Sequence, residues 1–129
     1  HLSLKEINNY LSQIQRILVE NGKITIIVPH YRNPYYFSDP THKTFFGLYT
    51  FDYLTKDRFF RRKVPNYAQI TNLKTENVSL NFISTKWFKI ITIFSNVLVN
   101  LNKSNLEFYE SNLANIFPPY EIKFILRKI

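Results

Sequence analysis

The sequence predicts an α/β fold, and three neighbouring features near its start carry that prediction. A capped amphipathic helix is expected at about residues 4–20, a turn at Asn21-Gly22 ends it, and a β-branched strand follows at 23–29. A helix, a glycine turn and a buried strand in this order form one half of a β-α-β unit, whose strands run parallel. We therefore expect a single partial domain over residues 1–129, with the strand before this helix lying upstream.

The first helix is predicted by its start, its periodicity and its end. Ser3 and Glu6 have the spacing of a capping box, in which each side chain accepts a hydrogen bond from the backbone N–H of the other residue. Gly22 is expected to supply a left-handed C-terminal cap. The apolar residues that recur at helical spacing are Ile7, Leu11, Ile14 and Leu18.

The run of β-branched residues at 23–29 has almost no polar alternation, which predicts a strand buried on both faces.

Glu107 and Glu110 are interpreted as acidic residues in the first turn of a late helix, where the helix dipole favours them. The other expected elements are a helix at 50–57 capped by Thr50, one long strand or a hairpin within 67–84, helices at 86–101 and 106–117, and a strand at 121–127 that completes a closing hairpin.

Composition excludes several classes of protein. A chain with 45% hydrophobic and 20% charged residues is typical of a globular domain rather than a disordered one. The absence of cysteine excludes a disulfide framework and fits a reducing compartment, so we expect a cytoplasmic protein. Two glycines are too few for a complete nucleotide-binding domain, whose phosphate loop alone uses two or three. The longest apolar stretch, 87–101, is too short and too polar to span a membrane.

The net charge of +8 leaves two alternative functions open. A basic, aromatic-rich module that binds nucleic acid without catalysis is one of them. Its basic residues are scattered, and the densest group is Arg58, Arg61, Arg62 and Lys63. The other alternative is a peripheral membrane contact, with residues 86–101 lying in the membrane interface.

A candidate site is predicted where the strand at 23–29 ends. Ligands of open α/β sheets bind beyond the carboxyl ends of the parallel strands, and His30 directly follows that end. The long aperiodic loop that begins there also contains Asp39 and His42, and loops of this length are usually functional. His1 stands where the preceding strand would end. All three histidines of the chain are therefore expected at one edge of the sheet.

Two interpretations of these residues stay open. In the catalytic one, an imidazole of His30 or His42 takes a proton from an attacking hydroxyl or amine, and Asp39 fixes the tautomer of His42. In the structural one, Asp39 accepts a hydrogen bond from a backbone N–H in a turn, and His42 packs on Phe45. For His30 the structural interpretation is favoured.

The same loop permits two further hypotheses. His30, Asp39 and His42 offer the two imidazoles and one carboxylate of non-haem iron and some zinc sites. Their spacing matches no strong metal motif, and we predict no metal site. The aromatic residues of the loop either pack among themselves or form a cage for a sulfonium or ammonium group. These residues are Tyr31, Tyr35, Tyr36, Phe37, Phe45 and Phe46.

Two sets of motifs resemble a known family. His1, followed by the run from Ile14 to Ile26, resembles the "EH … RVLKPGG" segment of class I S-adenosylmethionine-dependent methyltransferases. Glu20-Asn21 stands where that family usually has Lys-Pro. The motifs Val28-Pro29-His30 and Asp39-Pro40-Thr41-His42-Lys43, with Phe46, are similar to the "VPH…DPTHKRFF" pattern of a bacterial type 11-like subgroup. Phe108-Tyr109-Glu110 and the segment from Phe117 to Ile122 also fit it, so the resemblance covers nearly the whole chain.

The resemblance implies a Rossmann-like sheet of seven strands, in which 23–29 is the fifth strand and the last strand is antiparallel. It also implies methyl transfer from S-adenosylmethionine, with the glycine-rich cofactor loop upstream of residue 1. The chain would then be the C-terminal half of the domain, and a small molecule, a glycan or a lipid would be the methyl acceptor. From their positions we assign catalysis to His30, Asp39 and His42, substrate binding to Tyr31, Thr41, Lys43 and Phe46, and cofactor contact to His1.

Overall fold

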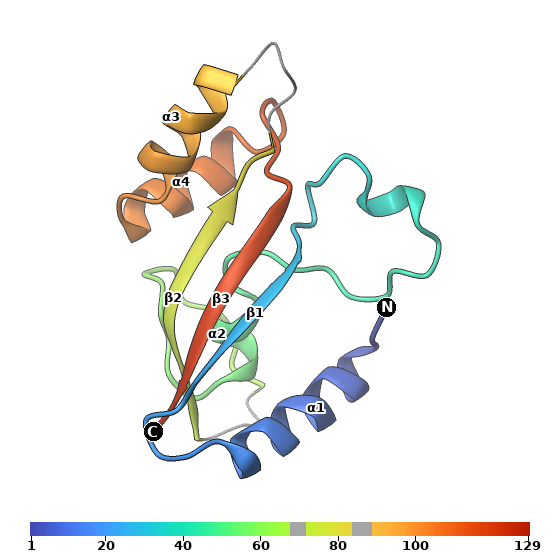
Figure 1. Cartoon of the computed structure of the whole chain (residues 1–129), viewed down its shortest axis with the longest axis vertical. Helices are drawn as coiled ribbons and strands as arrows, with labels where there is room; N and C mark the ends of the chain where they lie inside the picture. Colours follow the sequence, from blue (N-terminus) through green and yellow to red (C-terminus); the bar gives the residue numbers. More distant parts are fainter. Residues whose placement is uncertain (68–71, 84–88) are drawn as a thin grey trace.

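The computed structural model describes residues 1–67, 72–83 and 89–129. Its elements, in chain order, are α1 (Leu4–Ile17), β1 (Lys23–Pro29), the 3₁₀ turn η1 (Tyr36–Ser38), α2 (Thr50–Leu54), β2 (Leu73–Asn81), α3 (Lys89–Val99), α4 (Lys103–Asn112) and β3 (Glu121–Lys128). The strands form one sheet in the order β1-β3-β2, with β3 antiparallel to both neighbours (Figure 1). The fold is therefore mixed α/β, with the last strand in the centre of the sheet.

Helix α1 starts as predicted and ends earlier than predicted. The capping box is present, because Ser3 donates its backbone N–H to the Glu6 carboxylate at 2.7 Å and the Glu6 N–H donates to the Ser3 hydroxyl at 3.4 Å. The helix ends at Ile17, and the left-handed residue after it is Asn21, with φ 61°, rather than Gly22. Gly22 is needed for space instead, since a Cβ there would lie 2.8 Å from the backbone oxygen of Val19.

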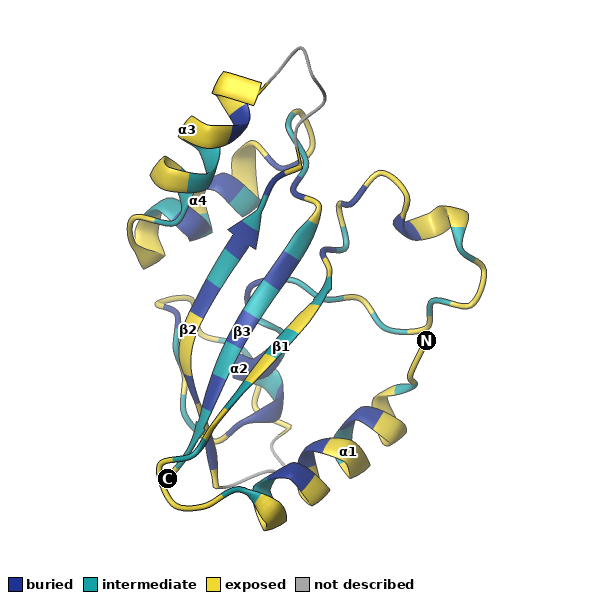
Figure 2. Ribbon diagram, viewed as in Figure 1, coloured by how far each residue is buried: buried dark blue, intermediate teal, exposed yellow. Residues whose placement is uncertain are grey.

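The core lies on one face of the sheet. Residues of β3 alternate between buried and partly exposed (Figure 2), and its Ile122, Phe124 and Leu126 are fully buried in the core cluster. Apolar side chains of α1, α2 and α4 belong to the same buried cluster, and the Phe51 ring of α2 meets the Phe124 ring edge-on at 4.6 Å. These helices therefore form a second layer against the sheet.

The prediction for the burial of β1 is wrong. The strand was expected to be buried on both faces, but its residues alternate between intermediate and exposed, and Ile27 is 54% exposed. Only the face that carries Ile24, Ile26 and Val28 packs against the core. In the described residues β1 pairs only with the antiparallel strand β3, and the parallel pairing expected with an upstream strand stays a prediction. As the edge strand of this sheet, β1 has one covered face and one open side.

Two other helix starts differ from the predictions. Helix α2 is capped by Tyr49 without a side-chain hydrogen bond, and the Thr50 hydroxyl accepts from the Gly47 N–H at 2.9 Å instead. Helix α4 begins at Lys103 because Asn102 caps it, accepting from the Asn105 N–H at 2.8 Å. Glu107 and Glu110 therefore do not lie in a first turn.

The stretch expected as a strand or hairpin within 67–84 contains the single strand β2, and its residues 68–71 lie outside the described part of the chain. The strands β2 and β3 do not form a hairpin, since α3 and α4 lie between them in sequence. Residues 86–88, predicted to begin α3, are also outside the described part.

Helix α3 packs against β2 in an unusual way, with polar side chains facing the protein. The Asn100 side chain accepts from the Leu80 N–H and donates to the Leu80 carbonyl, both at 2.7 Å. Asn96, one helical turn earlier, accepts from the Phe82 N–H at 3.0 Å. These two side chains occupy the edge of β2 where another strand would pair, and they leave the apolar residues of α3 on the outer side.

Candidate functional site

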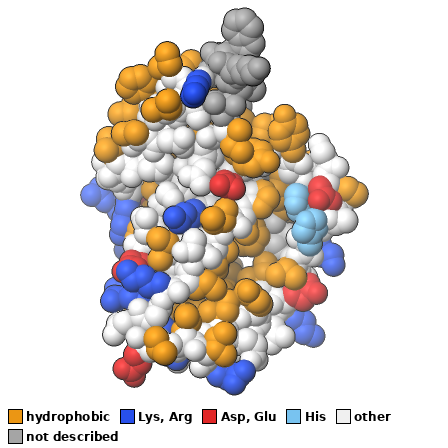
Figure 3. All heavy atoms as spheres, viewed as in Figure 1, with side chains coloured by type: hydrophobic (Ala, Val, Ile, Leu, Met, Phe, Trp, Pro, Cys, Tyr) orange, Lys and Arg blue, Asp and Glu red, His pale blue; other side chains and the backbone are white. Residues whose placement is uncertain are grey.

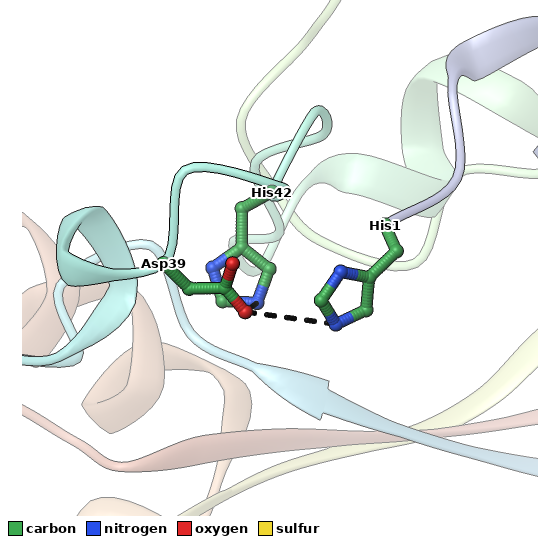
Figure 4. Close-up of side chains that lie close together, drawn as sticks. All are labelled: His1, Asp39 and His42. Carbon is green, nitrogen blue, oxygen red and sulfur yellow. Dashed lines mark ion pairs between the residues drawn. The ribbon is translucent and has the colours of Figure 1, made fainter.

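The loop after β1 folds back so that its middle reaches the start of the chain (Figure 1). Its path is fixed by backbone contacts. The Asn33 side chain donates to the Tyr120 carbonyl at 2.8 Å, and the Thr44 hydroxyl donates to the Leu2 carbonyl at 2.7 Å. As a result Asp39 and His42 lie beside His1, as the sequence predicts for the edge of the sheet (Figure 4).

Asp39 uses its two carboxylate oxygens differently. Its Oδ1 accepts from the Thr41 N–H at 2.9 Å and from the Thr41 hydroxyl at 2.6 Å, which is the turn expected in the structural interpretation. These bonds, the hydroxyl first, lower the pKa of the Asp39 carboxyl below its ordinary value, so the group is ionised at neutral pH. Its Oδ2 lies 3.8 Å from the Nε2 of His1 and 3.8 Å from the Nε2 of His42.

The tautomer of His42 follows from its contact with the backbone. Its Nδ1 lies 2.7 Å from the Tyr36 carbonyl oxygen, which can only accept, so Nδ1 carries a hydrogen, and in the neutral ring Nε2 keeps a lone pair. The ring stacks on the Tyr36 ring, with centroids 4.5 Å apart. Tyr36 thus takes the place expected for Phe45, and its carbonyl takes the orienting role expected for Asp39.

The tautomer of His1 follows from Thr41. The hydroxyl of Thr41 has one hydrogen, which it donates to Asp39, so it must accept from the Nδ1–H of His1. In the neutral ring, the Nε2 of His1 therefore also keeps a lone pair, and this atom faces the Asp39 carboxylate (Figure 4). The three side chains of His1, Asp39 and His42 are referred to below as the His–Asp–His cluster.

His30 lies apart from this cluster and is fully buried. Its Nδ1 accepts from the Arg32 N–H at 3.0 Å, so its Nε2 carries the hydrogen and donates to the Glu110 carboxylate at 2.9 Å. Glu110 also accepts from the Leu48 N–H at 2.9 Å. Both nitrogens of His30 are thus used in bonds that hold the fold, and a catalytic role for His30 stays a prediction.

Sequence reasoning missed Glu110 because it placed the start of α4 too late. With Asn102 as the cap, Glu110 lies one helical turn after Leu106, a buried residue, and so faces the interior. Asn102 is a residue type that often caps helices, and this was the available signal.

A mostly apolar cavity of about 370 Å³ lies next to the His30–Glu110 pair. Tyr31 and Phe46, both predicted to bind substrate, form part of its wall, and Glu110 is a charged residue in it. The other aromatic residues of its wall are Phe45, Tyr49, Tyr53 and Tyr67. Lys43 lies elsewhere, in an open depression beside the N-terminal turn of α1, and Thr41 belongs to the surroundings of the His–Asp–His cluster.

Comparison with protein-family models, with curated proteins and with solved structures finds no significant match to this chain. The fold and the site define a small mixed α/β protein whose three-stranded sheet is antiparallel. In the described part of the chain, no helix is long and apolar enough to cross a membrane. Chemically, the imidazoles of the exposed His1 and the partly exposed His42 can each accept a cation, whereas His30 is enclosed.

Proposed function

We propose that this chain is the acceptor-side, C-terminal part of an S-adenosylmethionine-dependent class I methyltransferase. The observation that supports the proposal best is the position of β3. The family that the sequence resembles has two strands after its fifth, of which the last is antiparallel. In the part of the chain that the structure describes, two strands follow β1, and the last of them is antiparallel to both of its neighbours.

The open side of β1 supports a larger sheet. In the described residues the strand pairs on one side only, and its outer face exposes Ile27. A strand at the edge of a sheet leaves one row of backbone N–H and C=O groups without a partner strand, and proteins usually cover such an edge when it is apolar. The proposal assigns this edge to the upstream strands of the sheet, which would carry the glycine-rich cofactor loop.

In this proposal the candidate site would bind the methyl acceptor. S-adenosylmethionine would supply an electrophilic methyl group, and transfer depends mainly on alignment of the acceptor atom with it. The cavity walls, which include Tyr31 and Phe46, would stack on an apolar acceptor, and an imidazole of the His–Asp–His cluster would take the proton from its hydroxyl or amine. The acceptor would be a small molecule, a glycan or a lipid, and the enzyme would act in the cytoplasm.

The proposal predicts different cofactor binding by the short and the extended chain. Residues 1–129 alone are expected to show no binding heat with S-adenosylmethionine, because the proposed cofactor loop lies upstream. The chain extended upstream in its reading frame is expected to bind with micromolar affinity. Isothermal titration calorimetry measures both. Micromolar binding by residues 1–129 would overturn the proposal, and so would an upstream frame without a strand–Gly-x-Gly-x-Gly–helix pattern.

A second candidate function is a peripheral membrane contact, and the outer side of α3 favours it. This side exposes Ile90, Ile93, Phe94 and Val97, whereas the polar Asn96 and Asn100 face β2. Apolar side chains gather over α3 in Figure 3, with a basic residue beside them. A helix with an unburied apolar side on a chain of net charge +8 is suited to an anionic lipid surface.

Vesicle binding tests this second function. The chain is expected to co-sediment with phosphatidylcholine vesicles that contain phosphatidylserine, and the double variant Phe94→Ser, Val97→Ser is expected to bind at least about tenfold more weakly, since burying one such side chain contributes roughly 1.5–3 kcal/mol. Val19→Ser, at an exposed position outside α3, is the matched control and should bind like the unaltered chain. Absence of sedimentation, or equal binding by all three proteins, would refute a lipid contact through α3.

The nucleic-acid alternative stays a prediction. Two basic side chains already lie over aromatic rings. The Arg62 guanidinium lies 5.1 Å from the Tyr49 ring centre, and the ammonium of Lys103, the first residue of α4, lies 3.7 Å from the Phe59 ring centre.

A further inference from the structure

We propose that His1, Asp39 and His42 bind a divalent first-row transition metal ion, with zinc as the representative ion. Each residue offers one ligand atom, and the three atoms lie within 4.8 Å of one another. The inference stands on this geometry and does not depend on methyl transfer, and with the ion bound neither imidazole would serve as the general base of the proposed function.

The strongest argument is the arrangement of hydrogens around the cluster. The contacts with Tyr36 and Thr41 place the hydrogen of each imidazole on Nδ1, so both Nε2 atoms direct a lone pair towards Asp39. The carboxylate of Asp39 also has only lone pairs to offer. When both rings are neutral, three electron-rich atoms therefore face one another, and a cation placed among them would stabilise this arrangement.

Each ligand is also oriented by a partner on its far side. The Nδ1–H of His42 donates to the Tyr36 carbonyl, and the Nδ1–H of His1 donates to the Thr41 hydroxyl. The Oδ1 of Asp39 accepts hydrogen bonds from the N–H and the hydroxyl of Thr41, which leaves Oδ2 to face the two imidazoles. Metal-binding histidines commonly donate their other ring N–H in this way, and such contacts fix the tautomer that binds the ion. The site thus has the outer hydrogen bonds that a metal site needs.

The spacing is close to what an ion requires. Ligand atoms of a tetrahedral zinc ion, each about 2.0–2.1 Å from the metal, are roughly 3.4 Å apart. The two measured separations from Asp39 are 3.8 Å. His1, whose side chain is 67% exposed, is free to move inward, whereas His42, stacked on Tyr36, is the fixed ligand.

The ligand types select the class of ion. Two imidazoles and one carboxylate suit zinc, iron, cobalt or manganese, whereas magnesium and calcium prefer oxygen ligands alone. Three protein ligands at an exposed position leave a coordination position open for water or for an oxygen of a bound molecule. The site therefore has the form of a reactive or recognition centre rather than a closed structural one.

Calorimetric titration of zinc chloride into the chain, produced without a polyhistidine tag, tests the proposal. One ion per chain is expected, because the third histidine, His30, is fully buried and bonded at both nitrogens. Asp39→Asn and His42→Gln should each weaken zinc binding at least about tenfold, and Thr41→Val, which removes only the orienting hydroxyl, should weaken it about 10–100-fold. Glu20→Gln, at an exposed carboxylate outside the site, is the matched control and should leave the affinity unchanged.

Two results would overturn the proposal. One is the absence of saturable zinc binding. The other is zinc affinity that is unchanged in the double variant Asp39→Asn, His42→Gln, since such binding would not use two of the three proposed ligands. Circular dichroism of every variant establishes that it is folded, which is expected because these three side chains are not in the core cluster. Magnesium chloride in place of zinc should give no saturable binding.

Discussion

Replacement of Glu110 by alanine is expected to lower the free energy of unfolding by about 2–6 kcal/mol, because two buried hydrogen-bond donors would lose their acceptor and each costs roughly 1–3 kcal/mol. The donors are the Nε2–H of His30 and the backbone N–H of Leu48, both 2.9 Å from the same carboxylate oxygen. His30 and Leu48 are buried, so water reaches neither donor readily. Urea denaturation followed by circular dichroism measures the change.

The large effect is expected because Glu110 joins three parts of the fold. It extends from α4 to the residue that follows β1 and to the segment that leads into α2. Without it, the loop that carries the candidate site would lose the contact that fixes its first residue. In the proposed enzyme, such a loss would disturb the acceptor cavity as well, since Glu110 lies in its wall.

Two variants distinguish this explanation from a general sensitivity of α4. Glu110→Gln keeps an oxygen that can accept from both donors, so it should retain most of the stability that Glu110→Ala loses. Phe108→Ala changes an exposed side chain of the same helix and is expected to stay within about 0.5 kcal/mol of the unaltered chain. If Glu110→Ala is as stable as Phe108→Ala, the His30–Glu110 bond does not support the fold.

Elements with strong local signals could be predicted from the sequence. The capping box of Ser3 and Glu6 marks the first residues of α1, and alternation marks β3. Neighbours in the sheet could not be predicted in this way. The β-branched run of β1 indicates a strand, but nothing in it shows that its described neighbour is β3, about a hundred residues later, or that one face is exposed.

The candidate site could likewise be predicted only in part. His1, Asp39 and His42 could be brought together because the end of a strand and the path of a loop determine their place. The partner of His30 could not, since Glu110 is 80 residues away and the distance depends on how α4 packs. The tautomers of His1 and His42 also depend on contacts with Tyr36 and Thr41 that only the folded loop creates.

Replacement of Asn100 by alanine is expected to lower the free energy of unfolding by about 2–4 kcal/mol, because the N–H and the carbonyl of Leu80 would both lose their partner. Leu80 is fully buried, and its backbone groups belong to the outer edge of β2. Asn100 also donates to the Asn96 carbonyl within α3, so its loss would loosen the last turn of the helix. Urea denaturation again measures the stability, and hydrogen exchange of the Leu80 amide reports the edge directly.

The exchange measurement separates a local effect from a global one. The Leu80 amide should exchange faster in Asn100→Ala than the Ile125 amide of the central strand β3, because the edge would open before the sheet unfolds. Asn9→Ala makes the same chemical change at an exposed position of α1, and it should be neutral or slightly stabilising since alanine favours helix. Equal stability of the two variants would mean that water replaces Asn100 at the edge of β2. A loss confined to Asn100→Ala would show that α3 is held by its polar side, which leaves its apolar side available for a lipid surface.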